Sequence, residues 1–380
     1  MKSLLVSSSY FPPNKGGISH MMAEVAKNLG TERVCCLTGV PQKKSGTEND
    51  NPFRVYTRLC SGNGYTKALR LGLTITEILI RERPRIIQLS TVGEGRLVPL
   101  LKKWIKIPFV VYAHGNEILM AMGKGPKSIE LITLRKADRI LAVSEYTADL
   151  VRRAGVDPKM IEIVHPGCDS ERFHPTVPTN EFRKKLLGPR HKDRIILTIG
   201  NLVSRKGHDM VIRALPRVLK SALDVTYLIV GEGPYRSQLE RLAKDMQVED
   251  RVVFAGQVEQ EDIPEVYGMC EVFTMPSRDQ TESCDVEGFG LVFLEANASG
   301  KPVIAGRSGG IPDAVIEGVS GLLVNPTDID EIANAIVKLL LNRDLATRLG
   351  SQGRERVMRD FNWEGIANRI QGILEGVIKS

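Results

Sequence analysis

The sequence predicts an α/β protein built from two doubly wound, Rossmann-like domains. Short apolar stretches alternate with amphipathic helical stretches from one end to the other, which is the pattern of a parallel sheet covered by helices on both faces. The alternation is interrupted once, at residues 171–192, where the periodicity is lost and proline and charged residues gather. A length of 380 residues suits two domains that each bury their own core. We therefore expect domains at residues 1–170 and 193–363, joined by a linker at 171–192.

The first domain is expected to begin with an apolar strand and a helix from about Ser19 to Leu29. Ser19 is placed to cap that helix, since a serine hydroxyl can accept a hydrogen bond from an unpaired amide of the first turn. The strands expected in this domain lie at residues 4–8, 33–37, 86–89, 109–113 and 139–143.

The second domain repeats the same alternation. Its expected strands lie at residues 195–200, 225–230, 251–254, 271–275, 302–305 and 321–324. Ligands of such sheets bind at the carboxyl ends of the strands. The loops that follow the strands are therefore the places to look for a site.

Composition predicts a soluble, cytoplasmic protein. Hydrophobic residues make up 42% of the chain and charged residues 26%, no signal-peptide pattern follows Met1, and no apolar run reaches the roughly 18 residues of a membrane span. The six cysteines form no C-x-x-C pair, which favours reduced, structural thiols. Cys284, in a glycine-containing loop, is also a candidate reactive thiol.

Charge is distributed unevenly along the chain. The formal net charge is +7, but residues 1–200 carry +14 and residues 201–380 carry −7. A basic half is expected to meet an acidic partner, such as phospholipid headgroups or a diphosphate-linked lipid, unless it is only a solvated surface. Trp104, among lysines within residues 100–108, either touches an anionic membrane surface or packs inward. Nucleic acid is not expected, because the basic residues are not interleaved with aromatic ones.

The segment Asp285–Gly300 is the candidate centre of the site. Gly288 and Gly290 precede an apolar stretch that predicts a buried helix opened by Gly290. The first amides of such a helix are unpaired and suit a phosphate group. Glu287 and Glu295, eight residues apart, are placed to hold the two ends of one elongated ligand.

This segment and its surroundings resemble family 4 of the retaining glycosyltransferases. The family's E-x7-E pattern, here Glu287 to Glu295, lies among three further matching stretches: Met275-Pro276-Ser277, residues 300–305 and residues 308–310. The sequence of these motifs is most similar to that of bacterial phosphatidylinositol alpha-mannosyltransferases. The resemblance implies the GT-B fold, in which two Rossmann-like domains face each other across a cleft and a last helix, at about residues 364–380, completes the first domain.

The resemblance assigns residues of the second domain to a nucleotide diphosphate sugar, the donor. Arg205 and Lys206 are expected to neutralise the leaving diphosphate. Asn201 stands where many relatives have an arginine, so it can donate a hydrogen bond but brings no charge. Glu287 is expected to hold sugar hydroxyls and Glu295 ribose hydroxyls. The backbone at Gln257 and Val258 is expected to meet the nucleobase, as in relatives. The amides of Phe289, Gly290 and Leu291, with Gly288 beside them, are expected to bind the donor phosphates.

Two sites are expected in the first domain. Gly16 and Gly17 precede its first helix and, in the resembled family, lie beside the donor phosphates, although such a pair is also common in tight turns. His114 follows a strand, and the resemblance implies that its ring contacts a sugar hydroxyl, whereas a lone histidine at this position is usually structural. With Glu287 and Lys206 it forms the expected catalytic set.

No metal and no other cofactor are expected. Asp328 and Asp330 form the D-x-D sequence with which unrelated glycosyltransferases bind a cation. However, Asp328 followed three residues later by Glu331 predicts a helix cap, and no cluster of histidines or cysteines suggests a ligand set.

The expected activity is the metal-independent, retaining transfer of a hexosyl group to a lipid-linked or glycan acceptor. The product would be an alpha linkage in a glycolipid or surface polysaccharide. GDP-mannose is the favoured donor and a UDP-hexose the next. A sugar-nucleotide epimerase or phosphorylase of the same fold, or a non-catalytic sugar-nucleotide-binding partner, are alternatives. We expect the enzyme in the cytoplasm, with peripheral contact at the inner face of the membrane.

Overall fold

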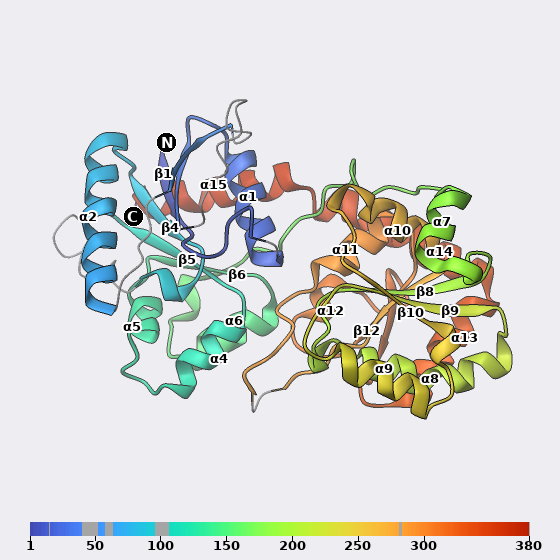
Figure 1. Cartoon of the computed structure of the whole chain (residues 1–380). Coiled ribbons are helices and arrows are strands. Elements are labelled where there is room, and N and C mark those ends of the chain that lie inside the picture. The colour runs from blue at the N-terminus through green and yellow to red at the C-terminus, as the bar shows by residue number, and fades with distance from the viewer. Residues whose placement is uncertain (15, 40–51, 58–63, 96–105, 281–282, 380) are drawn as a thin grey trace. The chain divides into compact units, whose positions relative to one another are not determined.

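The chain folds into two compact units in a computed structural model that describes residues 1–14, 16–39, 52–57, 64–95, 106–280 and 283–379, with the backbone alone for 64–71 (Figure 1). One unit comprises Met1–Pro166 together with Trp363–Ser380, and the other comprises Gly167–Asn362. The last helix, α15 (Trp363–Lys379), therefore belongs to the first unit although it follows the second in sequence.

The first unit is built on a parallel sheet that, within the described residues, has seven strands in the order β3-β2-β1-β4-β5-β6-β7. The order reverses at β1, which places a topological switch point between β1 and β4. The strands are β1 (Ser3–Val6), β2 (Val34–Thr38), β3 (Arg54–Thr57), β4 (Ile86–Leu89), β5 (Phe109–Ala113), β6 (Arg139–Ala142) and β7 (Ile161–Ile163).

Helices cover both faces of this sheet, because successive strand residues point to opposite sides. Leu4 and Val6 of β1 join a buried cluster with residues of α2, α4, α5 and α6, whereas α1 packs against α15 outside that cluster (Figure 1). The helices are α1 (Gly17–Leu29), α2 (Gly64–Glu82), α4 (Asn116–Gly123), α5 (Ile129–Lys136), α6 (Glu145–Arg153) and α15.

The second unit also contains a parallel sheet, with six strands among the described residues in the order β10-β9-β8-β11-β12-β13. Its order reverses at β8, so the switch point lies between β8 and β11. The strands are β8 (Arg194–Ile199), β9 (Val225–Val230), β10 (Val252–Gly256), β11 (Val272–Met275), β12 (Val303–Gly306) and β13 (Gly321–Val324).

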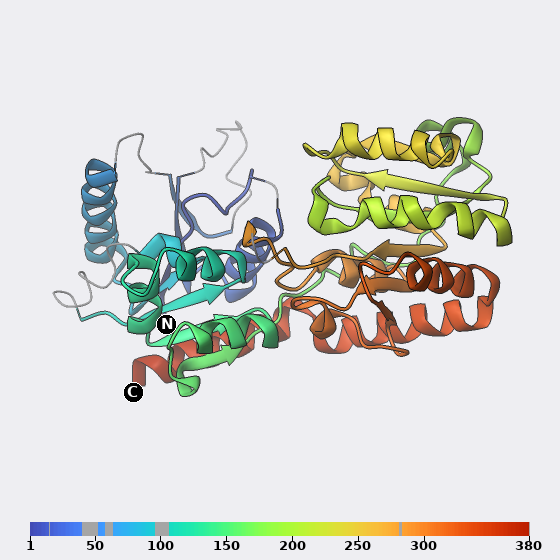
Figure 2. The same ribbon diagram turned by 90° about the horizontal axis from the view of Figure 1, so that it is seen from below.

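Helices lie on both sides of this second sheet as well (Figure 2). On one side α8, α9 and α13 bury their apolar residues against the strands, and on the other α11 packs against α14. The helices are α7 (Asn180–Leu187), α8 (His208–Ser221), α9 (Arg236–Asp245), α10 (Ile263–Met269), α11 (Leu291–Ala298), α12 (Ile311–Ala314), α13 (Ile329–Leu341) and α14 (Arg343–Asp360).

Every strand expected from the sequence is present, with ends shifted by at most two residues. Two strands were not expected, β3 and β7, and both lie at the edges of the first sheet. An edge strand is only half covered, so its apolar signal is weak: Arg54 and Thr57 of β3 are exposed. The expectation that Ser19 caps the first helix was wrong, because α1 begins at Gly17 with Gly16 as its cap residue.

Residues 171–192, for which we expected a linker, instead belong to the second unit and contain α7. The Thr179 side chain accepts a hydrogen bond from the Phe182 amide and caps this helix. Arg183 ties it to the sheet region, since its guanidinium donates to the carbonyls of His191, Asp193 and Met269. The high content of charge and proline therefore reflected a short surface helix that is fixed by hydrogen bonds.

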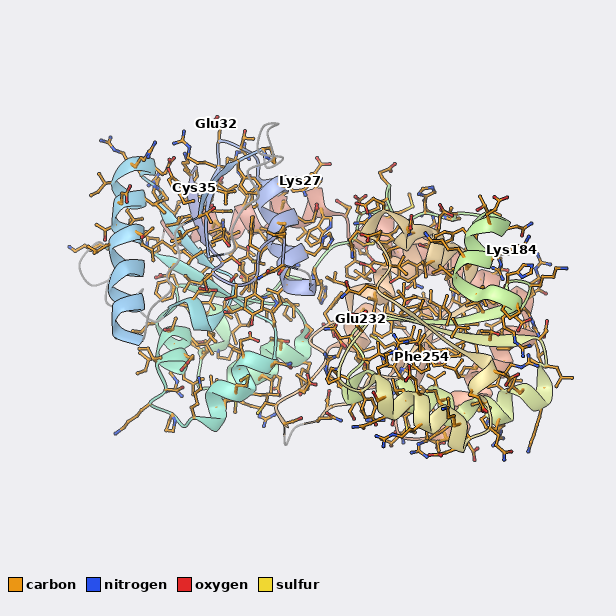
Figure 3. The ribbon with its side chains drawn as sticks, in the orientation of Figure 1. Lys27, Glu32, Cys35, Lys184, Glu232 and Phe254 are labelled. Atoms are coloured by element: carbon orange, nitrogen blue, oxygen red, sulfur yellow. The ribbon has the colours of Figure 1, made fainter. Side chains whose placement is uncertain are left out.

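The buried cysteines have the environment of structural thiols. Cys35, shown in Figure 3, and Cys270 are buried, and burial raises the pKa of each thiol to about 12. A thiol with so high a pKa is almost never ionised at neutral pH and is a poor nucleophile. Cys284 is partly exposed, and Cys60 lies outside the described residues.

The described helices include none that is both long enough and apolar enough to cross a membrane. Trp104 and its neighbours at 100–105, for which membrane contact or inward packing was expected, lie outside the described residues.

Candidate active site

The second sheet brings two charged loops together at its switch point. β8 is followed by a loop that contains Arg205 and Lys206, and β11 by a loop that contains Asp285 and Glu287. The two strands are neighbours in the sheet although β9 and β10 separate them in sequence. Open α/β sheets bind ligands at this position, because the chain leaves the two strands in opposite directions and opens a crevice between them.

The four side chains form one ion-pair network. Arg205 Nε donates to Asp285 Oδ1 at 2.7 Å, and Lys206 Nζ donates to Glu287 Oε2 at 2.7 Å. Arg205 Nη1 donates to the same Glu287 oxygen. Three of the side chains are nearly inaccessible: Lys206 is 12% exposed, Glu287 13% and Arg205 14%. The network contains two cations and two carboxylates, so its formal charges cancel.

The pKa shifts in this network follow from burial and from the neighbouring charges. Burial alone would raise the pKa of Glu287, but the charges of Lys206 and Arg205 outweigh it, and the pKa lies below its ordinary value. Burial lowers the pKa of Lys206, and the like charge of Arg205 acts in the same direction against the attraction of Glu287. Glu287 is therefore ionised at neutral pH, and two cations share its charge.

A glycine brings the two loops close together. Lys206 ends a short 3-10 turn, Ser204–Lys206, and Gly207 follows with a φ of 75° as the cap residue of α8. A Cβ atom on Gly207 would lie 2.2 Å from the Pro276 carbonyl oxygen of the other loop. The left-handed backbone and this close approach both require glycine.

Hydrogen bonds from residues that were not predicted also join the loops. The Arg278 amide donates to the Arg205 carbonyl at 2.9 Å, and the Arg278 guanidinium contacts Asp209 of α8 at 3.0 Å and Ser204 Oγ at 3.0 Å. Gln280 Nε2 donates to the same Ser204 hydroxyl at 2.8 Å. The position of Lys206 therefore depends on the loop after β11.

The helix expected in the central segment is confirmed. α11 begins at Leu291, with Gly290 in the left-handed region at a φ of 94° as its cap residue. The first amides of a helix have no partner within the helix, so this end of α11 is suited to an anion. The Phe289 ring is buried and packs 5.9 Å from Phe361. The phosphate contacts expected for the amides of Phe289, Gly290 and Leu291, and the place of Gly288 beside them, remain predictions.

Glu295 lies on α11, apart from the ion-pair network. Its Oε2 accepts a hydrogen bond of 2.7 Å from the hydroxyl of Tyr267, a buried residue of α10. This tyrosine was not predicted, because nothing in the sequence of α10 indicates that Tyr267 faces α11. The expected contact between Glu295 and a ribose remains a prediction.

The residues expected near the nucleobase lie at another part of the sheet. Gln257 and Val258 follow β10, which is two strands away from β8. Gly256, the last residue of β10, lies beside Glu232, which follows β9. Figure 3 labels Glu232, and also Phe254 of β10. Asn201 lies two residues after the end of β8 and is exposed. Gln257 and Val258 therefore follow a strand that is adjacent to neither β8 nor β11.

The first unit presents its candidates at the carboxyl ends of β1, β4 and β5. Gly16 and Gly17 form the start of α1, and Gly16 has a φ of 135°. His114 follows β5, and its Nε2 lies 2.9 Å from the Ser90 carbonyl oxygen. Because a carbonyl only accepts, Nε2 carries the proton. The His114 amide donates to Glu117 Oε1 at 2.6 Å, which fixes the start of α4.

A buried carboxylate at the switch point of the first sheet was not predicted. Glu94 is 6% exposed, and its Oε1 accepts hydrogen bonds from the Ser8 amide at 2.8 Å and the Ser8 hydroxyl at 2.6 Å. A glutamate in a glycine-containing loop gives no sequence signal that it is buried.

The D-x-D sequence is a helix cap, as predicted. Asp328 Oδ1 accepts from the amides of Asp330 and Glu331, each at 2.9 Å, at the start of α13. The Glu331 carboxylate accepts a hydrogen bond from the Asn325 amide. It therefore caps a neighbouring turn and does not bond to the Asp328 amide. Among the described residues, no group of three or more His, Cys, Asp or Glu side chains is arranged to hold a metal ion.

Comparison with known proteins identifies the family. The protein-family model "Glycosyltransferase Family 4" matches residues 15–172, and the protein-family model "Glycosyl transferases group 1" matches residues 179–356. A "GDP-mannose-dependent alpha-(1-6)-phosphatidylinositol monomannoside mannosyltransferase" of Mycobacterium tuberculosis is 32% identical over 385 residues, which covers 99% of each chain. The chain belongs to glycosyltransferase family 4.

Two further likenesses agree with this assignment. A monoacylated phosphatidylinositol monomannoside mannosyltransferase of Corynebacterium glutamicum, also named GDP-mannose-dependent, is 30% identical over 387 residues, or 98% of each chain. The crystal structure of HepE from Anabaena, in complex with UDP, superimposes with a TM-score of 0.83 at 20% identity and covers 99% of this chain and all of that one. The likeness confirms the predicted GT-B fold, and the protein is a glycosyltransferase.

A buried histidine of this glycosyltransferase leads to a prediction about pH. His208, the first residue of α8, is fully buried, with its Nε2 3.3 Å from the Asn201 carbonyl oxygen and its Nδ1 3.4 Å from the Tyr227 hydroxyl. Burial lowers its pKa from 6.5 to about 4. The unfolded chain therefore binds a proton that the folded protein does not, and stability is lost as the pH falls from about 6.5 to about 4. We expect the free energy of unfolding to drop by about 2 kcal/mol between pH 7 and pH 5 through this residue.

Urea unfolding of His208→Gln at the two pH values would measure that contribution. The variant should show a smaller difference between pH 7 and pH 5 than the wild type, whereas His174→Gln, at an exposed position, should keep the wild-type difference. An unchanged pH dependence in His208→Gln would show that other groups cause the acid sensitivity.

Proposed function

We propose that this glycosyltransferase moves a mannosyl group from GDP-mannose to a hydroxyl of a phosphatidylinositol-based glycolipid, with retention of the alpha configuration. The observation that carries the proposal is the buried pair of Lys206 and Glu287 at the switch point, beside the start of α11. It supplies a cation for a leaving diphosphate and a carboxylate for sugar hydroxyls. The names of the relatives that match over almost the whole chain supply the donor and the acceptor.

The reaction needs stabilisation of charge on the leaving group. As the bond between the anomeric carbon and the diphosphate oxygen breaks, negative charge develops on the diphosphate. Lys206 and the first amides of α11 would stabilise that charge through fixed positive groups. Their presence makes a metal ion unnecessary in this proposal. The acceptor oxygen bonds to the same face of the anomeric carbon, and its proton passes to a diphosphate oxygen.

Two further residue roles belong to the proposal. Glu287 accepts hydrogen bonds from sugar hydroxyls, and His114 contacts another sugar hydroxyl through its ring. His114 Nε2 already faces the Ser90 carbonyl, so the opposite nitrogen, Nδ1, is the one suited to accept from a ligand. Because a neutral imidazole can accept at that position, no proton transfer through His114 is required.

The membrane surface is the proposed location of the reaction. A phosphatidylinositol-based acceptor is embedded in a bilayer, and residues 1–200 carry a formal charge of +14. Basic residues are attracted to the anionic lipids of the cytoplasmic leaflet by about 1 kcal/mol each when close to the surface. We infer a cytoplasmic enzyme that binds the inner face of the membrane peripherally.

The donor can be identified by thermal unfolding of the purified protein with GDP, UDP and ADP and their common sugar conjugates. A ligand at about 100 times its dissociation constant should stabilise the protein by about 2.7 kcal/mol. With all ligands at one concentration, we expect the largest shift with GDP-mannose. We also expect mannosyl transfer to vesicle-bound phosphatidylinositol mannoside that EDTA does not inhibit. The NMR spectrum of the product should show an alpha linkage. A larger shift with UDP compounds, or transfer only from them, would contradict the mannosyl assignment.

A further inference from the structure

Arg205 is bound to two carboxylates of a single short segment. Its Nε donates to Asp285 Oδ1 at 2.7 Å, and its Nη1 donates to Glu287 Oε2. Asp285 and Glu287 are two residues apart in the loop after β11, so one guanidinium joins both. A planar guanidinium is suited to such a bridge, because its donors have fixed directions.

The two residues that carry these carboxylates are held in place by hydrogen bonds of their backbone groups. The Asp285 amide donates to the Gln280 carbonyl at 3.1 Å, and the Gln280 amide donates back to the Asp285 carbonyl at 2.9 Å. The Glu287 carbonyl accepts from the Gly310 amide at 2.9 Å. On the other side, the Arg205 carbonyl accepts from the Arg278 amide at 2.9 Å. Both ends of the bridge are therefore fixed to the protein frame.

Lys206 is bound differently from its neighbour. Its ammonium donates to Glu287 Oε2 at 2.7 Å, and among the described residues no second carboxylate forms an ion pair with it. A lysine ammonium has three donors on a flexible stem and can turn to a new anion. Arg205 has further N–H donors, but its guanidinium could turn to a new anion only by leaving two carboxylates.

We propose that Asp285 and Arg205 form a brace that positions Glu287 for the donor sugar, which leaves the diphosphate to Lys206, as in the proposed function. The proposal rests on the proposed function, and it changes the expected role of Arg205 from a phosphate contact to a positioning residue. Asp285, which opens the central segment but was given no role from the sequence, becomes a positioning residue as well.

The brace predicts opposite effects on the two parts of the donor. Asp285→Asn removes one negative charge, so the network becomes more positive and its affinity for a bare diphosphate should stay the same or increase. Arg205 would then have only one carboxylate, and Glu287 would lose its fixed orientation. Binding of the sugar and turnover should therefore fall while binding of the nucleotide does not.

The test uses the full chain and compares GDP with GDP-mannose by titration calorimetry, together with the rate of mannosyl transfer. For Asp285→Asn we expect the GDP affinity to be unchanged or higher, kcat to fall by about tenfold to a hundredfold, and the ratio of GDP-mannose affinity to GDP affinity to fall. For Lys206→Ala we expect the GDP affinity to fall at least about tenfold. Asp330→Asn, which removes the carboxylate of the exposed pair with Arg217, is the control and should match the wild type.

Two outcomes would overturn the brace. One is a loss of GDP affinity in Asp285→Asn as large as that in Lys206→Ala, and the other is a wild-type kcat in Asp285→Asn. If Asp285→Asn does not fold, Arg205→Lys decides. A lysine keeps the positive charge but lacks the fixed fork of donors that joins the two carboxylates, so kcat should fall while GDP affinity stays within about threefold. A tenfold loss of GDP affinity would make Arg205 a phosphate ligand.

The same measurements separate this proposal from the proposed function. UDP and UDP-glucose are titrated in parallel with the GDP pair. If the wild type binds and uses the UDP pair instead, mannosyl transfer is wrong, and the brace is judged by the same ratio on the UDP pair.

Discussion

Lys206→Ala should reduce kcat/KM for glycosyl transfer by about a hundredfold to a thousandfold, the cost of removing one fixed donor to a developing negative charge. The Lys206 side chain is only 12% exposed. Water therefore has little access to the position of the ammonium and would not replace it at the diphosphate. Initial rates over a range of donor concentrations, with the acceptor saturating, would measure the loss.

The fold of Lys206→Ala should be little affected, because Glu287 keeps its contact with Arg205. Lys220→Ala removes an exposed lysine of α8 in the same unit and serves as the matched control, with wild-type kinetics expected. A kcat/KM of Lys206→Ala within threefold of the wild type would mean that the diphosphate is bound elsewhere.

Glu287→Gln should lower the free energy of unfolding at pH 7 by about 3 kcal/mol and abolish most transfer. The substitution keeps the shape of the side chain but leaves two buried cations, Arg205 and Lys206, with Asp285 as the remaining carboxylate of the network. An uncompensated buried charge costs about 3 to 5 kcal/mol. Urea unfolding, with activity assays on the same samples, would measure both effects.

The charge imbalance can be tested in two further ways. Adding Lys206→Ala to Glu287→Gln restores equal numbers of cations and carboxylates, so the double variant should be more stable than Glu287→Gln alone. The pKa of Lys206 is already lowered by burial. The unfolded chain therefore keeps its proton to higher pH than the folded protein, and the deficit of Glu287→Gln should shrink as the pH rises toward about 10.

The control for this variant is Glu240→Gln, which breaks an exposed pair with Arg236 on α9. It should change stability by less than about 0.5 kcal/mol. If the double variant were less stable than Glu287→Gln, the loss would come from packing and not from unpaired charge.

Local patterns in the sequence were sufficient for most of the fold. Buried strands such as β5 and β9 are continuous apolar runs, and burial on both faces leaves that signal wherever the strand lies in the sheet. The edge strand β3 was missed because its residues are partly exposed. Capping signals were reliable for Gly290 and Asp328, since a helix start depends on neighbours in sequence. Ser19 failed because Gly16 had already started the helix.

The resemblance to family 4 supplied the candidate residues, but the sequence did not show how they pair. Lys206 and Glu287 were expected as separate contacts to a donor, one for phosphate and one for sugar. In the structure they bind each other, with Arg205 and Asp285. Glu295 belongs to the same motif as Glu287, but it accepts a hydrogen bond from Tyr267 of another helix. A motif records which residue types are present, whereas a contact depends on which loops are adjacent.

Two doubly wound domains could be predicted from the chain, because apolar periodicity is a local property, and the resemblance to family 4 predicted the glycosyltransferase activity. The tertiary structure alone decided the ion-pair network, the contact of Gly207 with Pro276 and the support of Lys206 by Arg278. The physical reason is the strand order. β8 and β11 are about 70 residues apart in sequence but adjacent in the sheet, and only that adjacency brings their two loops into contact at the switch point.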